Sequence, residues 1–188
     1  MNRQKTNINT KYLTLIPLFT VLTAIGAFIR IPLGLIPLSF QVIFVLLSSI
    51  LLGKYAYLSQ LLYLFLGLIG LPIFTSGGGG LYLLSPTFGY IIGFISSSFI
   101  IGNLIEINNI YDKKRLFLLS LLGVLIIHIF GVSYLFILKN FLVKESSLSL
   151  LNAIKFGSLV FLVSDIFWCF IASNVGYRLI KILNLHKS

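Results

Sequence analysis

Apolar positions along this chain gather in long blocks, and polar residues, glycine and proline are concentrated between the blocks. A helix needs about 20 predominantly apolar residues to cross a bilayer. The pattern therefore predicts a bundle of six transmembrane helices. We place these helices at residues 12–29, 39–53, 55–72, 84–105, 116–138 and 156–180, with the second and third joined only by a tight turn at Gly53-Lys54.

Composition supports the same class of protein. Hydrophobic residues make up 58% of the chain and charged residues only 10%, whereas a typical soluble domain has about 25% charged residues. We therefore expect an all-α integral membrane protein in which residues 1–188 form a single membrane domain surrounded by the lipid bilayer.

The distribution of lysine and arginine predicts the orientation of the bundle. If both termini are cytoplasmic, the inner segments carry ten of the 14 basic residues and the outer segments carry four. The positive-inside rule favours this arrangement, in which the Gly-rich segment 73–86 and the polar loop 139–155 lie outside. We expect the protein in the cell membrane, that is, the plasma membrane. Because the same rule explains the net charge of +10, no nucleic-acid partner is expected.

The first apolar block has a second interpretation. Basic residues precede it and small residues end it at Ala24, Gly26 and Ala27, as in a cleaved signal peptide. Its apolar core of 17 residues, Tyr12–Phe28, is long for such a segment. Cleavage would leave five spans and a poorer charge balance, so we favour a retained helix.

Asp165 is the most informative single residue, because an acidic side chain within a span costs about 2.5–3.5 kcal/mol on insertion scales and usually faces a cavity or a partner. We expect it to bind a ligand; the alternative is a structural pair with a hydroxyl or with Arg30. His128 stands alone within the fifth block, and we interpret it as a hydrogen-bonded packing residue.

The segment Leu71–Tyr90 contains four consecutive glycines, Gly77, Gly78, Gly79 and Gly80, and no charge. It is too apolar for a solvated linker and too rich in glycine and proline for a helix. A segment of this kind fits a loop folded over a ligand, with backbone N–H groups free to bind it. The aromatic residues near this loop or near Asp165 could hold a small planar ligand; they are Tyr82, Tyr90 and Trp168.

Small residues spaced by four mark three helix faces: Gly89, Gly93 and Ser97; Ala172 and Gly176; and Thr20 and Ala24. Such spacing lets helix backbones approach closely. We expect the first two faces to pack inside the bundle, whereas Thr20 and Ala24 could equally contact another membrane protein.

Several catalytic patterns are absent from the sequence. It has no HExxH, GxSxG or Cys/His cluster, so an intramembrane enzyme, a metal site and a cofactor are not expected. It also has no P-loop, because Gly53-Lys54 is followed by Tyr55. If the chain transports a solute, the energy must come from an ion or from other subunits.

Three motifs together resemble the BioY family, the biotin-transport S components of energy-coupling factor (ECF) transporters. They are Ile-Pro-Leu-Gly-Leu-Ile-Pro-Leu-Ser-Phe-Gln at 31–41, Leu-Gly-Leu-Ile-Gly-Leu-Pro at 66–72, and the glycine tract followed by Ser-Pro-Thr-Phe-Gly-Tyr at 85–90. The resemblance runs from about residue 19 to 102 and resumes around Asp165.

The resemblance implies six helices with cytoplasmic termini and capture of biotin at an outward-facing site under the loop between the third and fourth helices. It implies energy supplied by a module of one transmembrane coupling protein and two ATPase subunits, although some members are reported to work without it. It also implies contact of Thr20 and Ala24 with the coupling protein, and it adds Gln41, the last residue of the first motif, to the expected site.

Two departures from the family pattern are visible. Members usually have Pro-Gly-Asp followed three residues later by Lys, whereas this chain has Val163, Ser164, Asp165 and Trp168. Members also usually have two glycines before the tyrosine at position 90, and here Phe88 takes the first place. The lost lysine leaves open which cation, if any, binds the biotin carboxylate.

A physical account of the biotin site follows from the resemblance. Asp165 can accept hydrogen bonds from the ureido N–H groups, and the Gly77–Gly80 amides can donate to the ureido oxygen or the carboxylate. The three aromatic residues can cover the apolar ring, and Arg30 or Lys155 can supply a cation. Two alternatives remain open: an S component for a biotin precursor or another small vitamin, and a membrane scaffold that transports nothing.

Overall fold

Helices account for most of the residues that the computed structural model describes, which are residues 10–33, 36–143 and 147–183. Arg3, Lys5, Lys144 and Lys187 of the charge count, and Gly34-Leu35 of the first motif, lie outside the described residues. The first half of the chain contains α1 (Thr10–Phe28), β1 (Arg30–Ile31), β2 (Leu38–Ser39), α2 (Gln41–Leu52), η1 (Gly53–Tyr55), α3 (Ala56–Leu68) and η2 (Gly80–Leu84). The second half contains α4 (Phe88–Ile107), α5 (Lys113–Ile137), a π-helical turn η3 (Leu138–Leu142), α6 (Leu150–Gly157), η4 (Leu159–Phe161) and α7 (Leu162–Leu183).

Local sequence explains where several helices begin and end. Just beyond α3, Gly70 has a φ of 115°, which favours glycine, and Pro72 follows it. The Asp112 side chain accepts a hydrogen bond from the Arg115 N–H and caps α5, and Ser149 caps α6 in the same way. Such caps satisfy N–H groups that have no partner within the helix.

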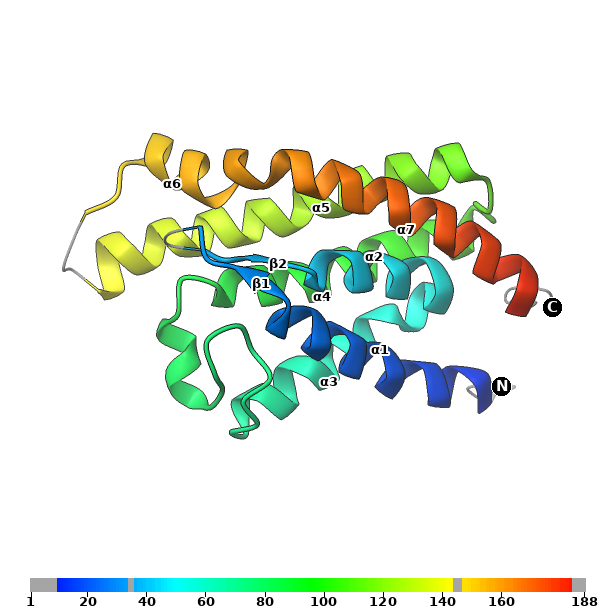
Figure 1. Cartoon of the computed structure of the whole chain (residues 1–188), viewed down its shortest axis with the longest axis horizontal. Helices are drawn as coiled ribbons and strands as arrows, with labels where there is room; N and C mark the ends of the chain where they lie inside the picture. Colours follow the sequence, from blue (N-terminus) through cyan, green and yellow to red (C-terminus); the bar gives the residue numbers. More distant parts are fainter. Residues whose placement is uncertain (1–9, 34–35, 144–146, 184–188) are drawn as a thin grey trace, which may run out of the picture.

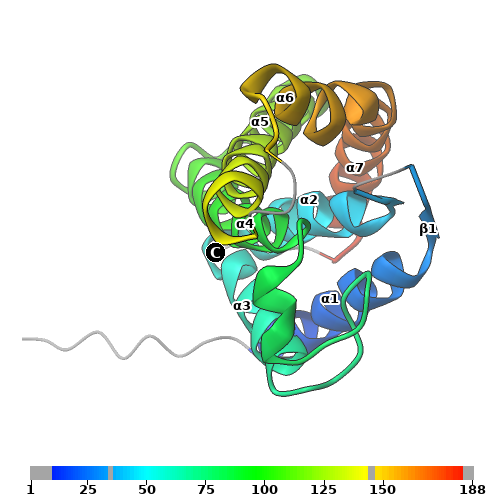
Figure 2. The ribbon, with the colours of Figure 1, turned by 90° about the vertical axis from the view of Figure 1, so that its left-hand side faces the viewer.

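The helices lie roughly side by side along the long axis of the molecule (Figure 1). Viewed from one end, α2 and α4 lie between α1 and α3 on one side and α5 and α7 on the other (Figure 2). The short antiparallel pair β1–β2, with Arg30 opposite Ser39, lies toward the end opposite to the start of α1 and the finish of α7 (Figure 1).

Buried apolar side chains form two clusters among the described residues. One joins α2, α4, α5 and α7 around Leu46, Ile50 and Ile101, with Trp168 at its edge. The other lies toward the β1–β2 end and is rich in aromatic side chains from α3, α4 and the 71–87 loop. This second cluster supports the candidate site described below.

By length and composition, five helical stretches of the described residues can cross a membrane: Thr10–Phe28, Gln41–Leu68, Phe88–Ile107, Lys113–Leu142 and Leu150–Leu183. The six predicted spans differ from these because Gln41–Leu68 counts here as one stretch. Within that stretch the chain reverses direction at η1 (Figure 1), where Gly53 has a φ of 55°.

The helix boundaries differ from the predicted ones in two regions. The fourth span does not begin at residue 84, because η2 ends there and α4 begins at Phe88, beyond Pro86. The polar loop predicted at 139–155 instead contains η3 and most of α6. The helix predicted from 156 is interrupted at Ser158, whose backbone (φ −137°, ψ −59°) is not helical.

Candidate functional site

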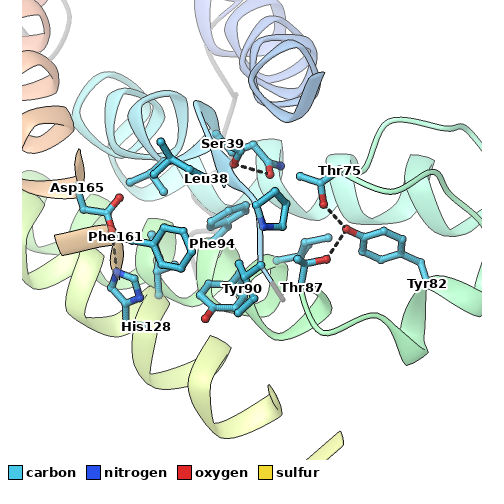
Figure 3. A pocket seen from close by; sticks show the side chains of 16 residues that line it. Leu38, Ser39, Thr75, Tyr82, Thr87, Tyr90, Phe94, His128, Phe161 and Asp165 are labelled. Atoms are coloured by element: carbon cyan, nitrogen blue, oxygen red, sulfur yellow. Dashed lines mark hydrogen bonds and ion pairs between the residues drawn. The ribbon is translucent and has the colours of Figure 1, made fainter. Parts of the chain in front are cut away.

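A partly open cavity lies among α2, α4, α5 and α7, close to the β1–β2 pair (Figure 3). It holds about 540 Å³ of empty space, its open mouth included. Most of its lining is apolar, with a few convergent polar groups. The lining residues are Ile36, Pro37, Leu38, Ser39, Gln41, Val42, Thr75, Tyr82, Thr87, Tyr90, Ile91, Phe94, Ile127, His128, Phe161 and Asp165.

An acid–imidazole pair forms one side of the cavity. Asp165 near the start of α7 and His128 on α5 are only 4% and 8% exposed, and 2.8 Å separates Asp165 Oδ2 from His128 Nε2. Figure 3 shows this pair facing Phe161 and Tyr90. The expected alternatives for Asp165, a hydroxyl or Arg30, are not its partners; the partner is His128.

Tyr90 is held in the cavity lining by one hydrogen bond and two glycines. Its hydroxyl donates to the Gly157 carbonyl at 2.5 Å, where α6 ends. A Cβ atom at Gly131 would lie 2.3 Å from the Tyr90 ring, and a Cβ at Gly157 would lie 2.9 Å from the hydroxyl. Both distances are below normal van der Waals contact, so glycine at 131 and 157 makes the room that Tyr90 occupies.

Tyr82 ties the 71–87 loop to the cavity. Its hydroxyl lies 2.8 Å from the Thr75 hydroxyl and 2.6 Å from the Thr87 hydroxyl (Figure 3). Its ring packs against Phe74, with centroids 4.4 Å apart, and Phe74 packs in turn against Tyr63. The loop is therefore anchored by buried aromatic and hydroxyl contacts rather than by charge.

Gln41, the first residue of α2, links the cavity to α3. Its side-chain Nε2 donates to the Tyr63 hydroxyl at 2.8 Å, and its Oε1 accepts from the Ser39 hydroxyl at 3.1 Å. Tyr63 donates onward to the Ile73 carbonyl in the loop. These bonds position β2, α3 and the loop around one end of the cavity.

The glycine tract lies beside the cavity and does not line it. The Gly79 N–H donates to the Gly67 carbonyl at 2.7 Å, and the Gly77 N–H donates to the Phe74 carbonyl at 3.3 Å. A Cβ at Gly78 would lie 2.1 Å from the Leu71 carbonyl oxygen. The tract therefore allows the loop to fold back on the end of α3; of the expected ligand donors, the Gly77 and Gly79 amides already have partners.

Trp168 and Arg30 also lie outside the lining. The Trp168 ring packs against Phe40 and Phe167, with centroids 4.5 and 5.3 Å away, and its indole N–H is buried without a partner. Arg30 is exposed on β1, and Lys155 is exposed on α6. Neither cation is among the described residues that line the cavity.

The two residues of the expected partner-binding face differ in exposure. Thr20 is 3% exposed, and its hydroxyl lies within hydrogen-bond distance of the Ser59 carbonyl on α3, so it faces the inside of the molecule. Ala24, one turn later, is half-buried. The outward face of α1 is formed instead by Val21, Ile25 and Phe28, which are 44–63% exposed.

Four of the expected binding residues therefore line the cavity, namely Gln41, Tyr82, Tyr90 and Asp165. His128 is buried and hydrogen-bonded, as predicted, but its pairing with Asp165 in the cavity lining was not predicted. An available signal was that two ionisable residues within apolar spans commonly pair with each other. Thr75 and Thr87 were not predicted either, because their hydroxyls have no distinguishing sequence pattern.

The side chains of the cavity can bind a ligand that has an N–H donor and an apolar body. Among the described residues the Asp165 carboxylate bonds to His128 through Oδ2, so its other oxygen, Oδ1, can accept an N–H from a ligand. Aromatic and aliphatic side chains surround it. No group of three or more metal-ligating side chains occurs among residues 10–33, 36–143 and 147–183.

Long apolar helices and a mostly apolar internal cavity define a helical membrane protein with a candidate site for a small molecule. A family model described as "BioY family" matches residues 1–185. The chain belongs to the BioY family.

Relatives and a solved structure support this membership. The chain is 39% identical over 176 residues to the probable biotin transporter BioY of Lysinibacillus sphaericus, covering 93% of this chain and 89% of the relative. It is 39% identical over 171 residues to the biotin transporter BioY of Thermotoga maritima, covering 88% and 93%. A crystal structure of the S component for biotin from an ECF-type ABC transporter superposes with a TM-score of 0.83 at 28% identity, covering 95% of both chains.

Proposed function

We propose that this chain is the biotin-binding S component of an ECF-type vitamin transporter. The observation that supports the proposal is the composition of the cavity. Asp165 presents a carboxylate oxygen that is not bonded to His128, and aromatic and aliphatic side chains surround this oxygen. Biotin combines a ureido ring with two N–H donors, an apolar thioether ring and an aliphatic tail. Asp165 accepts from the ureido N–H groups, and Tyr82, Tyr90 and Gln41 contact the rest of the bicycle.

The glycine tract takes part indirectly in this proposal. Gly77, Gly78 and Gly79 let the loop fold so that Thr75 and Tyr82 reach the cavity, whereas Gly80 has room for a side chain. Trp168 supports α2 through Phe40. Arg30 and Lys155 remain outside the lining and attract the carboxylate of biotin only at long range.

The proposed transporter works in the plasma membrane as one membrane domain with six crossings. In this topology α2 and α3 cross separately, both termini are cytoplasmic, and the 71–87 loop and the cavity mouth face outward. A separate ECF module of one coupling protein and two ATPase subunits supplies the energy. The coupling protein contacts the α1 face that includes Ala24, Val21 and Ile25, with Thr20 behind it.

Equilibrium binding of biotin to the purified protein tests the proposal. We expect saturable binding that Asp165→Asn weakens more than tenfold, which corresponds to about 1.4 kcal/mol, because a charge-assisted hydrogen bond becomes a neutral one. Asp112→Asn is the matched control, since Asp112 is exposed and asparagine caps a helix as well as aspartate. The absence of saturable biotin binding, with another vitamin bound instead, would overturn the proposal.

One observation favours testing a second ligand class. The described lining contains no lysine or arginine, and Trp168 stands where family members usually carry lysine. A biotin precursor or another small vitamin is therefore the alternative ligand. Competition of these compounds against labelled biotin distinguishes the two, because the preferred ligand displaces the label at the lowest concentration.

A further inference from the structure

The pair His128–Asp165 belongs to a longer chain of hydrogen bonds that ends at a helix terminus. His128 Nδ1 lies 3.2 Å from the Gly157 carbonyl oxygen, and the Tyr90 hydroxyl donates to the same oxygen. Gly157 is the last residue of α6, where helix carbonyls lack partners within the helix. Tyr90 and His128 therefore complete the hydrogen bonding of this carbonyl.

These contacts fix the tautomer of His128. A carbonyl oxygen only accepts hydrogen bonds, so Nδ1 must carry a proton. Nε2 lies 2.8 Å from Asp165 Oδ2, and two lone pairs would repel at that distance, so one proton must lie between these two atoms.

A single shared proton makes the pair neutral overall. The pair is either imidazolium with carboxylate or imidazole with carboxylic acid, and its net charge is zero in both forms. Tyr90 and Gln41, which line the same cavity, and Cys169, four residues after Asp165 on α7, carry no charge at neutral pH. In both forms Asp165 Oδ1, the oxygen that is not bonded to His128, remains an acceptor.

Apart from the His128–Asp165 pair, the residues that line the cavity carry no charge. Among the 16 lining residues His128 and Asp165 are the only ionised candidates at neutral pH, and none is lysine or arginine. A cavity of no net charge that presents a fixed acceptor suits a neutral head group with N–H donors. It offers no ion pair to an anionic tail.

We infer that His128 is a positioning residue that holds Asp165 through one shared proton, and that the cavity recognises the neutral N–H head group of its ligand while leaving the carboxylate unpaired. This inference rests on the proposed function, because biotin is the ligand with which it is stated. It predicts both a ligand preference and a pattern among variants at position 128.

A first experiment compares the affinity of the protein for biotin with its affinity for biotinamide, in which a neutral amide replaces the carboxylate. We expect the two dissociation constants to agree within about threefold, because no side chain in the lining pairs with the carboxylate. A biotinamide affinity at least tenfold lower would overturn this half of the inference and would indicate a cation at the carboxylate. If wild-type protein binds neither compound, the proposed function fails instead.

A second experiment compares two variants, His128→Gln and His128→Asn. Each amide side chain can replace the hydrogen bond of one of the two imidazole nitrogens. Glutamine can place its amide N–H near the position of Nε2 and keep a donor to Asp165, whereas asparagine reaches only the position of Nδ1 and the Gly157 carbonyl. We therefore expect His128→Gln to bind biotinamide within about threefold of wild type and His128→Asn to bind at least tenfold more weakly. Equal affinities of the two folded variants would overturn the positioning role.

A spectroscopic measurement on the unaltered protein covers the case in which a variant does not fold. The chain contains two histidines, His128 and His186, so ¹⁵N labelling of histidine gives few ring signals, and a His186→Gln variant assigns them. We expect Nδ1 of His128, which faces the Gly157 carbonyl, to show the chemical shift of a protonated ring nitrogen. A bare-nitrogen signal from Nδ1 would overturn the inference, because the pair would then carry a net negative charge.

Discussion

Gly131→Ala is the substitution whose effect follows most directly from the geometry of the site. A Cβ at this position would lie 2.3, 2.4 and 2.5 Å from three atoms of the Tyr90 ring. Because Gly131 lies on the helix backbone of α5, the ring must move instead. Movement breaks the 2.5 Å hydrogen bond from the Tyr90 hydroxyl to Gly157 and shifts an aromatic side chain that lines the cavity.

The size of this effect comes from three contributions. Overpacking of a buried site costs about 1–3 kcal/mol, and loss of the hydrogen bond costs about 1 kcal/mol. Alanine in place of glycine within a helix returns up to about 1 kcal/mol. The net loss of about 1–4 kcal/mol corresponds to a melting temperature lower by about 2–16 °C for a chain of this size.

Thermal unfolding in detergent, followed through the single tryptophan Trp168, measures this change. Gly80→Ala is the control, because a Cβ there meets nothing within 4 Å; we expect it to change stability by less than about 0.5 kcal/mol. A double-mutant cycle with Tyr90→Ala isolates the clash. If Gly131→Ala costs the same with and without the Tyr90 ring, the reasoning is refuted.

Two further substitutions test the loop and the core. Tyr82→Phe removes the hydroxyl that bridges Thr75 and Thr87; we expect a stability loss of about 1–2 kcal/mol and faster release of labelled biotin, and an unchanged release rate would contradict the anchoring role of this hydroxyl. Gln60→Leu removes a buried amide whose Oε1 has no partner and whose Nε2, with two N–H groups, lies 3.1–3.4 Å from three hydroxyl oxygens. Because the loss of these bonds is offset by relief of the unpaired oxygen, thermal unfolding should change by no more than about 1 kcal/mol; a loss above about 3 kcal/mol would show that the amide is essential.

Helices were the most predictable part of this fold. Block length and hydropathy located every long helix to within a few residues at most ends, because a membrane-spanning helix must be apolar along its whole length. The breaks within the last helical stretch were not predictable in this way. Ser158 interrupts the helix between α6 and η4, yet the surrounding residues remain apolar, so hydropathy carries no signal of the break.

The candidate site was predictable where a residue type was costly in its context. Asp165 stood out because a carboxylate is expensive within a span, and it does line the cavity. Its partner His128 lies 37 positions away on another helix, and pairing across helices depends on packing that no local pattern encodes. The glycine tract was recognised as unusual, but the partners of its amides depend on how the loop folds against Gly67 and Phe74.

A structure of the protein with bound biotin tests the central claim most directly. The account predicts the ureido ring within hydrogen-bond distance of Asp165 Oδ1, with His128 still bonded to Oδ2 and Tyr90 beside the bicyclic ring. It also predicts that the carboxylate lies toward the cavity mouth without an ion pair in the lining. Biotin bound elsewhere, or bound in the cavity with its carboxylate rather than its ureido ring next to Asp165, would contradict the account.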